Sequence, residues 1–247
     1  MDKTTEESLR THAAAEYPRE SCGLIILAGG KEHYVPCRNI AERSGRRHKF
    51  MMSPEDYADA EDVGKIIALV HSHPDHPAIP SQADRVICEK SGLVWHVVRV
   101  DGAECIPTTA EIETIAPCGY QAPLVGREFF HGVLDCYALV QDWFERERGV
   151  LLPDFERRDG WWSDGSGENL YMQQFRSAGF IEVSLDDIQV GDCFIMQHRS
   201  EVANHSGVYL GGGLFLHHLY GRLSTRDVYG GYWKEITRVV VRYQGSN

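Results

Sequence analysis

The sequence Val70-His71-Ser72-His73-Pro74, followed after a loop by Ser81-Gln82-Ala83-Asp84, is the stretch that determines the predicted fold of the first half of the chain. The aliphatic run at residues 66–70 is typical of a buried strand. Because side chains alternate along a strand, His71 and His73 are expected to point to the same side of its end. The end of this strand therefore offers two imidazole rings to one site.

A carboxylate follows these rings at a spacing that suits the same site. Ser81 is a typical N-cap residue, and Asp84 lies one turn into the predicted helix, from where its carboxylate can turn back toward the rings. Two histidines and one carboxylate are a ligand set for zinc, which leaves a position for water and lowers the pKa of that water to about 7. The Ser-x-x-Asp spacing is also a capping-box pattern, which on its own is usually structural.

A general base for this site is available in Glu20, just before the strand-like residues 24–27. The upstream Glu, the His-x-His-Pro segment and the Ser-x-x-Asp segment together resemble the pattern of the JAMM (MPN) metalloprotease family. The zinc ligands that this resemblance implies are His71, His73 and Asp84. It also implies that Glu20 is the general base and that the Ser81 hydroxyl stabilises the oxyanion.

A second group of reactive residues begins at Cys136, which follows Asp135 at the start of the helical pattern of residues 135–144. Asp135 is predicted to be the N-cap, which places the Cys136 thiol at the positive end of the helix dipole. This position favours the thiolate, which is the nucleophilic form of cysteine. The alternative is that Cys136 is only a small buried apolar residue.

Two histidines further along the chain favour the interpretation of Cys136 as a nucleophile. Residues 204–211 and 214–217 are predicted to be two strands joined by a glycine turn, and His205 and His217 lie on them. His205 can act as general base toward Cys136, and His217 can orient the ring of His205. Alternation along the second strand places His217 and His218 on opposite faces, so that only one of them should face the site.

The second half resembles the NlpC/P60 family of cysteine peptidases. The shared segments are Asp-Cys-x-x-Leu-Val, His-x-Gly-x-Tyr-Leu-Gly and x-Phe-x-His, and their match selects His217 over His218. The resemblance implies cleavage of the peptide stems of bacterial peptidoglycan. At residues 128–132 the chain differs from many members, which carry there a Pro-Tyr pair whose hydroxyl contacts the substrate.

These resemblances predict two domains of the α+β or mixed α/β class. Residues 1–112 are predicted to form a JAMM/MPN-like sheet with flanking helices, and residues 124–247 a papain-like NlpC/P60 domain. Residues 113–123 belong to a proline-containing stretch without clear periodicity and are predicted to be a linker. The order of the two domains resembles the tail tip assembly protein K family of long-tailed bacteriophages.

This last resemblance implies partners among the phage tail tip proteins and a peptide hydrolase with two sites, a zinc metallopeptidase and a cysteine endopeptidase. They would act in tail tip maturation, in local cell-wall cleavage during infection, or in both. The alternative function is that of a structural tail assembly subunit whose two peptidase sites are vestigial or inactive outside the tail.

Composition excludes other classes of protein. The formal net charge is −11, no run of Lys and Arg stands out, and nucleic-acid binding is therefore not expected. The seven cysteines form no C-x-x-C pair, which fits a reducing compartment. No signal peptide or membrane span is predicted. We expect the chain in the host cytoplasm during assembly and, with the virion tail tip, in the periplasm on infection.

Overall fold

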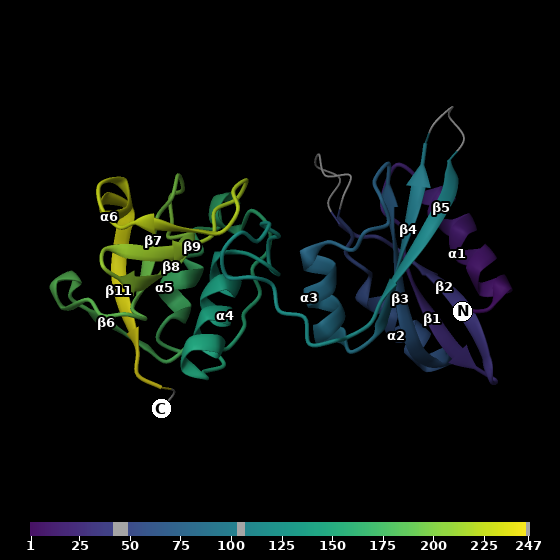
Figure 1. Cartoon of the computed structure of the whole chain (residues 1–247), viewed down its shortest axis with the longest axis horizontal. Coiled ribbons are helices and arrows are strands. Elements are labelled where there is room, and N and C mark those ends of the chain that lie inside the picture. Colours follow the sequence, from purple (N-terminus) through teal and green to yellow (C-terminus); the bar gives the residue numbers. More distant parts are fainter. Residues whose placement is uncertain (42–48, 103–106, 246–247) are drawn as a thin grey trace. The chain divides into compact units, whose positions relative to one another are not determined.

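A computed structural model of the chain describes residues 1–41, 49–102 and 107–245. The chain forms two compact units, Met1–Gln121 and Ala122–Asn247, which we call the N-terminal and the C-terminal unit (Figure 1). Each unit contains one sheet and several helices, so the predicted α+β class with two domains is confirmed.

In its described residues, the N-terminal unit is a five-stranded sheet with three α-helices. Its strands follow the order β2-β1-β3-β4-β5. β3 and β4 are parallel and are connected through α3, as parallel strands require a crossover, whereas the other neighbouring pairs are antiparallel. The elements in chain order are α1 (Lys3–Glu16), β1 (Cys22–Ala28), β2 (Lys31–Cys37), α2 (Pro54–Val63), β3 (Lys65–Pro74), α3 (Gln82–Ser91), β4 (Val94–Asp101) and β5 (Thr108–Ile115).

The strand predicted at residues 66–70 is part of β3, the central strand of this sheet. β3 continues through His71 and His73 because it pairs with β4 along this whole length. On its other side, His71 lies opposite Cys22 of β1. The two rings are therefore fixed to paired backbone, and His71 is buried inside the unit.

The helix predicted after Ser81 is α3. The Ser81 hydroxyl accepts a hydrogen bond from the Asp84 N–H at 3.1 Å, and the Asp84 carboxylate accepts one from the Ser81 N–H at 2.7 Å. This is a complete capping box, so the structural interpretation of the motif is confirmed. The cap uses Oδ2 of Asp84 and leaves Oδ1 for another partner.

The predicted linker is wrong at its start, because residues 113–115 belong to β5. β5 pairs antiparallel with β4 at the edge of the sheet. Most of its side chains are exposed or only partly buried, which is why its sequence shows no strong apolar alternation. Edge position thus concealed the strand in the sequence pattern.

The C-terminal unit begins with one long helix and continues mainly with strands. Its sheet is antiparallel, in the order β10-β9-β8-β7-β11-β6. Its elements are α4 (Cys136–Arg148), the 3₁₀ helix η2 (Trp161–Ser163), α5 (Leu170–Gln174), β6 (Phe180–Val183), the 3₁₀ helix η3 (Leu185–Asp187), β7 (Cys193–Met196), β8 (His205–Gly211), β9 (Leu214–His217), β10 (Thr225–Val228), α6 (Tyr232–Ile236) and β11 (Thr237–Tyr243).

The predicted hairpin of two histidine-bearing strands is formed by β8 and β9. Its turn consists of Gly211, Gly212 and Gly213, all with positive φ, a conformation that glycine adopts without strain. Alternation divides the hairpin between two cores. Val208 and Leu216 lie in the core that contains α4, whereas Phe215 lies in a second core with Phe194 on the other face of the sheet.

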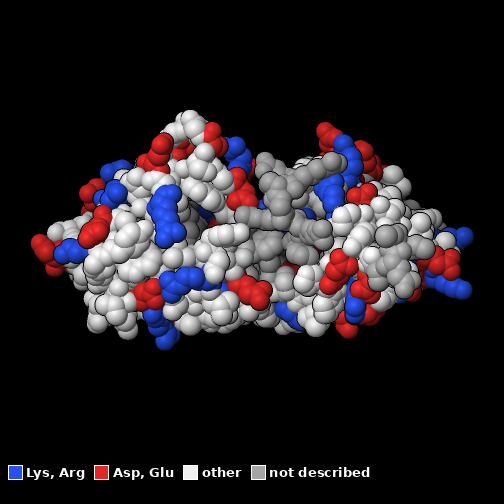
Figure 2. Space-filling model, turned by 90° about the horizontal axis from the view of Figure 1, so that it is seen from above, with Lys and Arg blue, Asp and Glu red and all other residues white. Residues whose placement is uncertain are grey.

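The surface carries charges of both signs. On the face shown in Figure 2, Lys and Arg side chains are interspersed with Asp and Glu over both units. None of the helices within the described residues combines the length and the apolar character that a membrane span requires.

Candidate active sites

The three predicted metal ligands of the N-terminal unit lie together. The Nε2 atoms of His71 and His73 are 3.1 Å apart. Asp84 Oδ1 is 3.4 Å from His71 Nε2, and Asp84 Oδ2 is 3.7 Å from His73 Nε2. β3 supplies both rings, and the first turn of α3 supplies the carboxylate. These three residues form a group that could hold a metal ion.

The separations fit a tetrahedral metal site. Donors bonded at about 2.0–2.1 Å to one zinc ion lie roughly 3.4 Å apart. His73 Nδ1 is 2.9 Å from the carbonyl oxygen of Pro77, to which it can donate, leaving Nε2 with a lone pair for a metal. His71 Nδ1 is buried and has no hydrogen-bond partner among the described residues. The donors present suit a divalent cation that accepts nitrogen and oxygen ligands.

Aromatic packing fixes the buried ring of this group. Phe50 stacks on His71 with ring centroids 4.9 Å apart, and Trp95 meets the same ring edge-on at 5.6 Å. Burial lowers the pKa of His71, but the attraction of Asp84 outweighs it and raises this pKa above the ordinary value. The ring is thus held both by packing and by its ionic partner.

Glu20 is brought to the same group. It is 5% exposed, and burial raises its pKa to about 8, opposed by the attraction of His71 and reinforced by repulsion from Asp84. The flanking backbone is fixed, because the Ser21 N–H donates to the Ser72 hydroxyl at 2.8 Å and Asn39 donates to the Glu20 carbonyl at 2.9 Å. A carboxyl group with a pKa near neutrality is well placed to take and return a proton.

Ser81 lies at the other side of Asp84. Its hydroxyl oxygen accepts the Asp84 N–H, so the hydroxyl hydrogen still has to find an acceptor. The capping box accounts for this residue, and its role as a hydrogen-bond donor to an oxyanion stays a prediction.

In the C-terminal unit, Asp135 caps α4 as predicted. Asp135 Oδ1 accepts the Ala138 N–H at 2.8 Å, and Oδ2 accepts the Gly132 N–H at 2.9 Å and Arg157 Nε at 2.8 Å. The side chains of Asp135 and Arg157 are each only 2% exposed. Burial opposes ionisation of Asp135, but Arg157 and the Ala138 N–H, with a smaller effect of His131, together outweigh it, and the pKa of this carboxyl is lowered.

Cys136 lies in a buried environment. Burial raises the pKa of its thiol, and repulsion from Asp135 adds to this, whereas hydrogen bonds from Tyr171 and Ser206 lower it by less. Burial of the thiol thus opposes the thiolate that the helix start is predicted to favour. Sγ is 3.2 Å from the Tyr171 hydroxyl of α5. Within the described residues, no hydrogen bond joins Sγ to His205.

The two predicted histidines form a pair on the sheet. His205 Nε2 and His217 Nδ1 are 3.0 Å apart, and His217 Nε2 is 3.1 Å from Asp227 Oδ2. Burial, followed by the neighbouring His217, lowers the pKa of His205 well below its ordinary value. β8 packs against α4, so His205 begins the strand that lies beside the helix of Cys136. Burial thus disfavours the charged form of both the thiol and the imidazole.

The structure brings His217, and not His218, to His205. His218 is fully buried beside Phe129, with ring centroids 5.0 Å apart. Both of its ring nitrogens are without a hydrogen-bond partner in the described part of the chain, and burial together with Arg127 lowers its pKa to about 4. His218 is thus a buried ring that is not hydrogen-bonded to the histidine pair.

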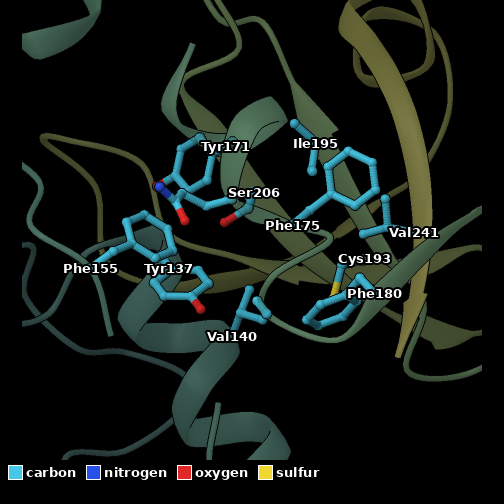
Figure 3. A pocket seen from close by; sticks show the side chains of 12 residues that line it. Tyr137, Val140, Phe155, Tyr171, Phe175, Phe180, Cys193, Ile195, Ser206 and Val241 are labelled. Atoms are coloured by element: carbon cyan, nitrogen blue, oxygen red, sulfur yellow. The ribbon is translucent and has the colours of Figure 1, made fainter. Parts of the chain in front are cut away.

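A cavity of about 30 Å³ lies in the core of the C-terminal unit (Figure 3). Tyr137 and Tyr171 form one part of its wall, and Phe175 and Phe180 another, with the Ser206 hydroxyl among otherwise mostly apolar groups. Such a volume holds about one or two water molecules. It is therefore a packing gap and not a substrate cleft.

Comparison with known proteins agrees with this division of the chain. A model of prokaryotic homologues of the JAB domain matches residues 2–111, and the NlpC/P60 family model matches residues 126–242. The tail tip assembly protein K of Escherichia phage N15 is 41% identical over 244 residues, which cover 99% of this chain and 96% of that protein. The chain belongs to the tail tip assembly protein K family. The family membership predicted from the order of the motifs is confirmed.

A second member of the K family shows the same relationship. The tail tip assembly protein K of Escherichia phage lambda is 37% identical over 196 residues, covering 78% of this chain and 89% of that protein. A solved NlpC/P60 family protein from Bacillus cereus aligns with 96% of this chain and 66% of its own at 12% identity. Its TM-score of 0.35 is too low to carry an argument about the fold.

Sequence reasoning missed several residues that contact the two sites of this K family member. Tyr171 and Arg157 support Cys136 and its cap, and Asp227 binds His217. Phe50 holds His71. All four lie ten or more residues along the chain from the residue that they contact and belong to no local motif, so only the fold reveals them.

Proposed function

We propose that the chain is a phage tail tip assembly protein with two peptide hydrolase sites, one in each unit. The observation that carries the proposal is that both sets of reactive residues are assembled in the fold. The ligand atoms of His71, His73 and Asp84 lie within 4.8 Å of one another, and His205 and His217 are paired on β8 and β9, of which β8 packs against the helix of Cys136. Folding alone requires neither arrangement.

The N-terminal unit is proposed to be a zinc-dependent peptidase or isopeptidase. A zinc ion held by His71, His73 and Asp84 would supply Lewis-acid chemistry. Glu20 would take a proton from the attacking water and return it to the leaving amine, a role that its pKa near neutrality supports. The Ser81 hydroxyl would donate to the oxyanion. The JAB family match supports this role, since the matched residues include the whole group.

The C-terminal unit is proposed to be a cysteine endopeptidase. Cys136 Sγ would attack the scissile carbonyl, His205 would accept the thiol proton and pass it to the leaving amine, and His217 would orient His205. Water would then hydrolyse the thioester. The NlpC/P60 match supports the peptide stems of peptidoglycan as the substrate.

The name of the relatives supports tail tip proteins as partners. We propose that the chain acts in the host cytoplasm while the tail is assembled. If it stays with the tail tip, infection brings the C-terminal unit to the cell wall, where its proposed substrate lies.

One observation favours a second function, that of an assembly subunit whose cysteine site is inactive in the free chain. Cys136 is only 5% exposed, and burial raises the pKa of its thiol. In this conformation the nucleophile is closed to a substrate. Tail partners would then have to open it.

The test is mass spectrometry of fragments released from purified peptidoglycan by the wild-type chain, Cys136→Ala and His71→Ala, each with and without a chelator. We expect stem fragments whose release is lost in Cys136→Ala and kept in His71→Ala and with the chelator. Release that needs His71 or the metal would instead assign wall cleavage to the N-terminal unit. If no form releases fragments, even when assembled tails replace the free chain, the enzymatic proposal fails.

A further inference from the structure

The hydrogen-bond chain of the C-terminal unit continues beyond the predicted histidine pair to Asp227. His205 Nε2 lies 3.0 Å from His217 Nδ1, and His217 Nε2 lies 3.1 Å from Asp227 Oδ2. Asp227 is on β10, which pairs with β9 and places Asp227 opposite Phe215. The three neighbouring strands β8, β9 and β10 thus each contribute one side chain to this row of hydrogen bonds.

The order of donors and acceptors along this chain follows from the carboxylate at its end. An ionised carboxylate only accepts hydrogen bonds, so the proton of neutral His217 must be on Nε2. His217 Nδ1 then carries a lone pair and accepts from His205, whose proton must be on Nε2. The remaining nitrogen of His205, Nδ1, is left with a free lone pair. This is the form of the ring that can take a proton.

Packing holds the hydrogen-bonded side chains in this arrangement. Trp233 lies against both rings, with centroids 4.6 Å from that of His217 and 6.0 Å from that of His205. Phe215 stacks on His217 at 4.4 Å. Arg222 Nη1 is 3.4 Å from Asp227 Oδ2 and gives the carboxylate a cationic partner. The rings therefore have little freedom to turn and exchange their nitrogens.

We propose that Asp227 is a positioning residue that fixes the tautomer of His217 and, through it, the tautomer of His205, so that His205 Nδ1 is the basic atom. As a statement about the reaction, this rests on the cysteine peptidase function proposed above. As a statement about protonation, it stands on the hydrogen-bond geometry alone. No family motif identified Asp227, which lies ten residues beyond His217.

Nitrogen NMR of the full chain labelled with ¹⁵N-histidine tests the protonation directly. Near pH 8 we expect both His205 and His217 to be protonated on Nε2. The signals of each ring are assigned by their absence from the spectra of His205→Gln and His217→Gln. In Asp227→Ala the obligate acceptor is gone, and His217 should populate the Nδ1-protonated form as well. A wild-type His217 protonated on Nδ1, or a tautomer that does not respond to Asp227→Ala, would overturn the proposal.

Alkylation of Cys136 by iodoacetamide provides the chemical readout, quantified by peptide mass spectrometry with the exposed Cys118 as internal reference. Only the thiolate reacts, and burial disfavours it, so the reaction depends on a base that accepts the proton. At pH 7 we expect a rate at least about tenfold lower in Asp227→Asn and Asp227→Ala, in line with the range for general-base catalysis. Partial recovery in Asp227→Glu would separate positioning from simple loss of fold.

The matched control is Asp186→Asn, which removes one exposed carboxylate from the same unit and should leave the rate unchanged. The pH profile must be compared in all variants, because the histidine pair also faces the titratable or charged side chains of His198, His218 and Arg222. Equal rates in wild type and both Asp227 variants would overturn the proposal.

The two proposals fail in different ways. Peptidoglycan cleavage by the wild type and by Asp227→Ala at equal rates would leave the peptidase function intact and remove the role of Asp227. Absence of cleavage by any form, together with the expected tautomers and their change in Asp227→Ala, would remove the peptidase function and keep the positioning of the rings.

Discussion

Removal of the Arg157 side chain is expected to destabilise the C-terminal unit strongly. Arg157 Nε is 2.8 Å from Asp135, and both side chains are only 2% exposed. Its Nη1 also donates to Asp154 at 2.7 Å and to the Phe155 carbonyl at 2.8 Å. Truncation of one partner of a buried ion pair leaves a buried charge and costs about 3–5 kcal/mol. Arg157→Ala therefore has an effect far above that of a surface substitution.

The magnitude can be converted to a melting temperature. A unit of this size, Ala122–Asn247, unfolds with an entropy of roughly 0.26 kcal/mol/K, so a loss of about 4 kcal/mol lowers its Tm by about 15 °C. The matched control is Arg158→Ala. The Arg158 side chain is 60% exposed and pairs with Asp164 at 3.3 Å, so its loss should cost about 1 kcal/mol at most, or about 4 °C.

The assay is differential scanning calorimetry of the full chain, with hydrogen exchange read by peptide to assign each transition to its unit. The difference in Tm between wild type and Arg157→Ala is also expected to depend on pH. Since Arg157 lowers the pKa of Asp135 in the fold, the pair contributes above about pH 4 and is lost as the pH falls through the lower folded value. Equal shifts for Arg157→Ala and Arg158→Ala at pH 7 would refute the reasoning.

Three further predictions concern single residues. After loading with zinc, the wild-type chain should hold about one zinc per chain by elemental analysis, and His71→Ala should hold almost none. The control His33→Ala, which changes an exposed histidine, should match the wild type. Zinc retained in His71→Ala would contradict the ligand assignment. Tyr171→Phe should slow alkylation of Cys136 at pH 7 about tenfold, because one hydrogen bond that lowers the thiol pKa is lost. An unchanged or faster rate would show that the hydroxyl does not lower this pKa. Buried His218 has a pKa of about 4, so the free energy of unfolding should fall by about 1–2 kcal/mol as the pH is lowered from 7 to 5. The reason is that the unfolded ring takes up a proton below about pH 6.5, whereas the folded ring does not. In urea unfolding, His218→Gln should lack this loss, and an identical pH dependence in both forms would contradict it.

Sequence patterns were sufficient where the signal is local. The aliphatic run of β3, the Ser81 cap of α3 and the glycine turn between β8 and β9 each depend on neighbouring residues, and all three are present in the structure. The spacing of His71 and His73 on one strand likewise placed both rings on one side. Family resemblance then connected Glu20 to this group from a distance of about 50 residues in the sequence.

The sequence was insufficient where tertiary packing decides. β5 was not recognised because an edge strand needs few buried side chains, so its pattern looks like that of a linker. The helix start at Cys136, which favours the thiolate, is visible in the sequence, whereas the depth of burial, which opposes the thiolate, is not. Asp227, Tyr171 and Arg157 come from loops or short elements, and their contacts exist only in the folded unit.

The measurement that tests the central claim most directly is trapping of the covalent intermediate in the C-terminal unit. The chain, alone and within assembled tails, is mixed with a purified peptidoglycan stem peptide, quenched with acid and digested for mass spectrometry. We expect a mass increase equal to the acyl part of the stem on the peptide that contains Cys136, absent in Cys136→Ala and strongly reduced in His205→Ala. Cleavage of the stem that persists in Cys136→Ala, or no adduct and no cleavage in either preparation, would contradict the account.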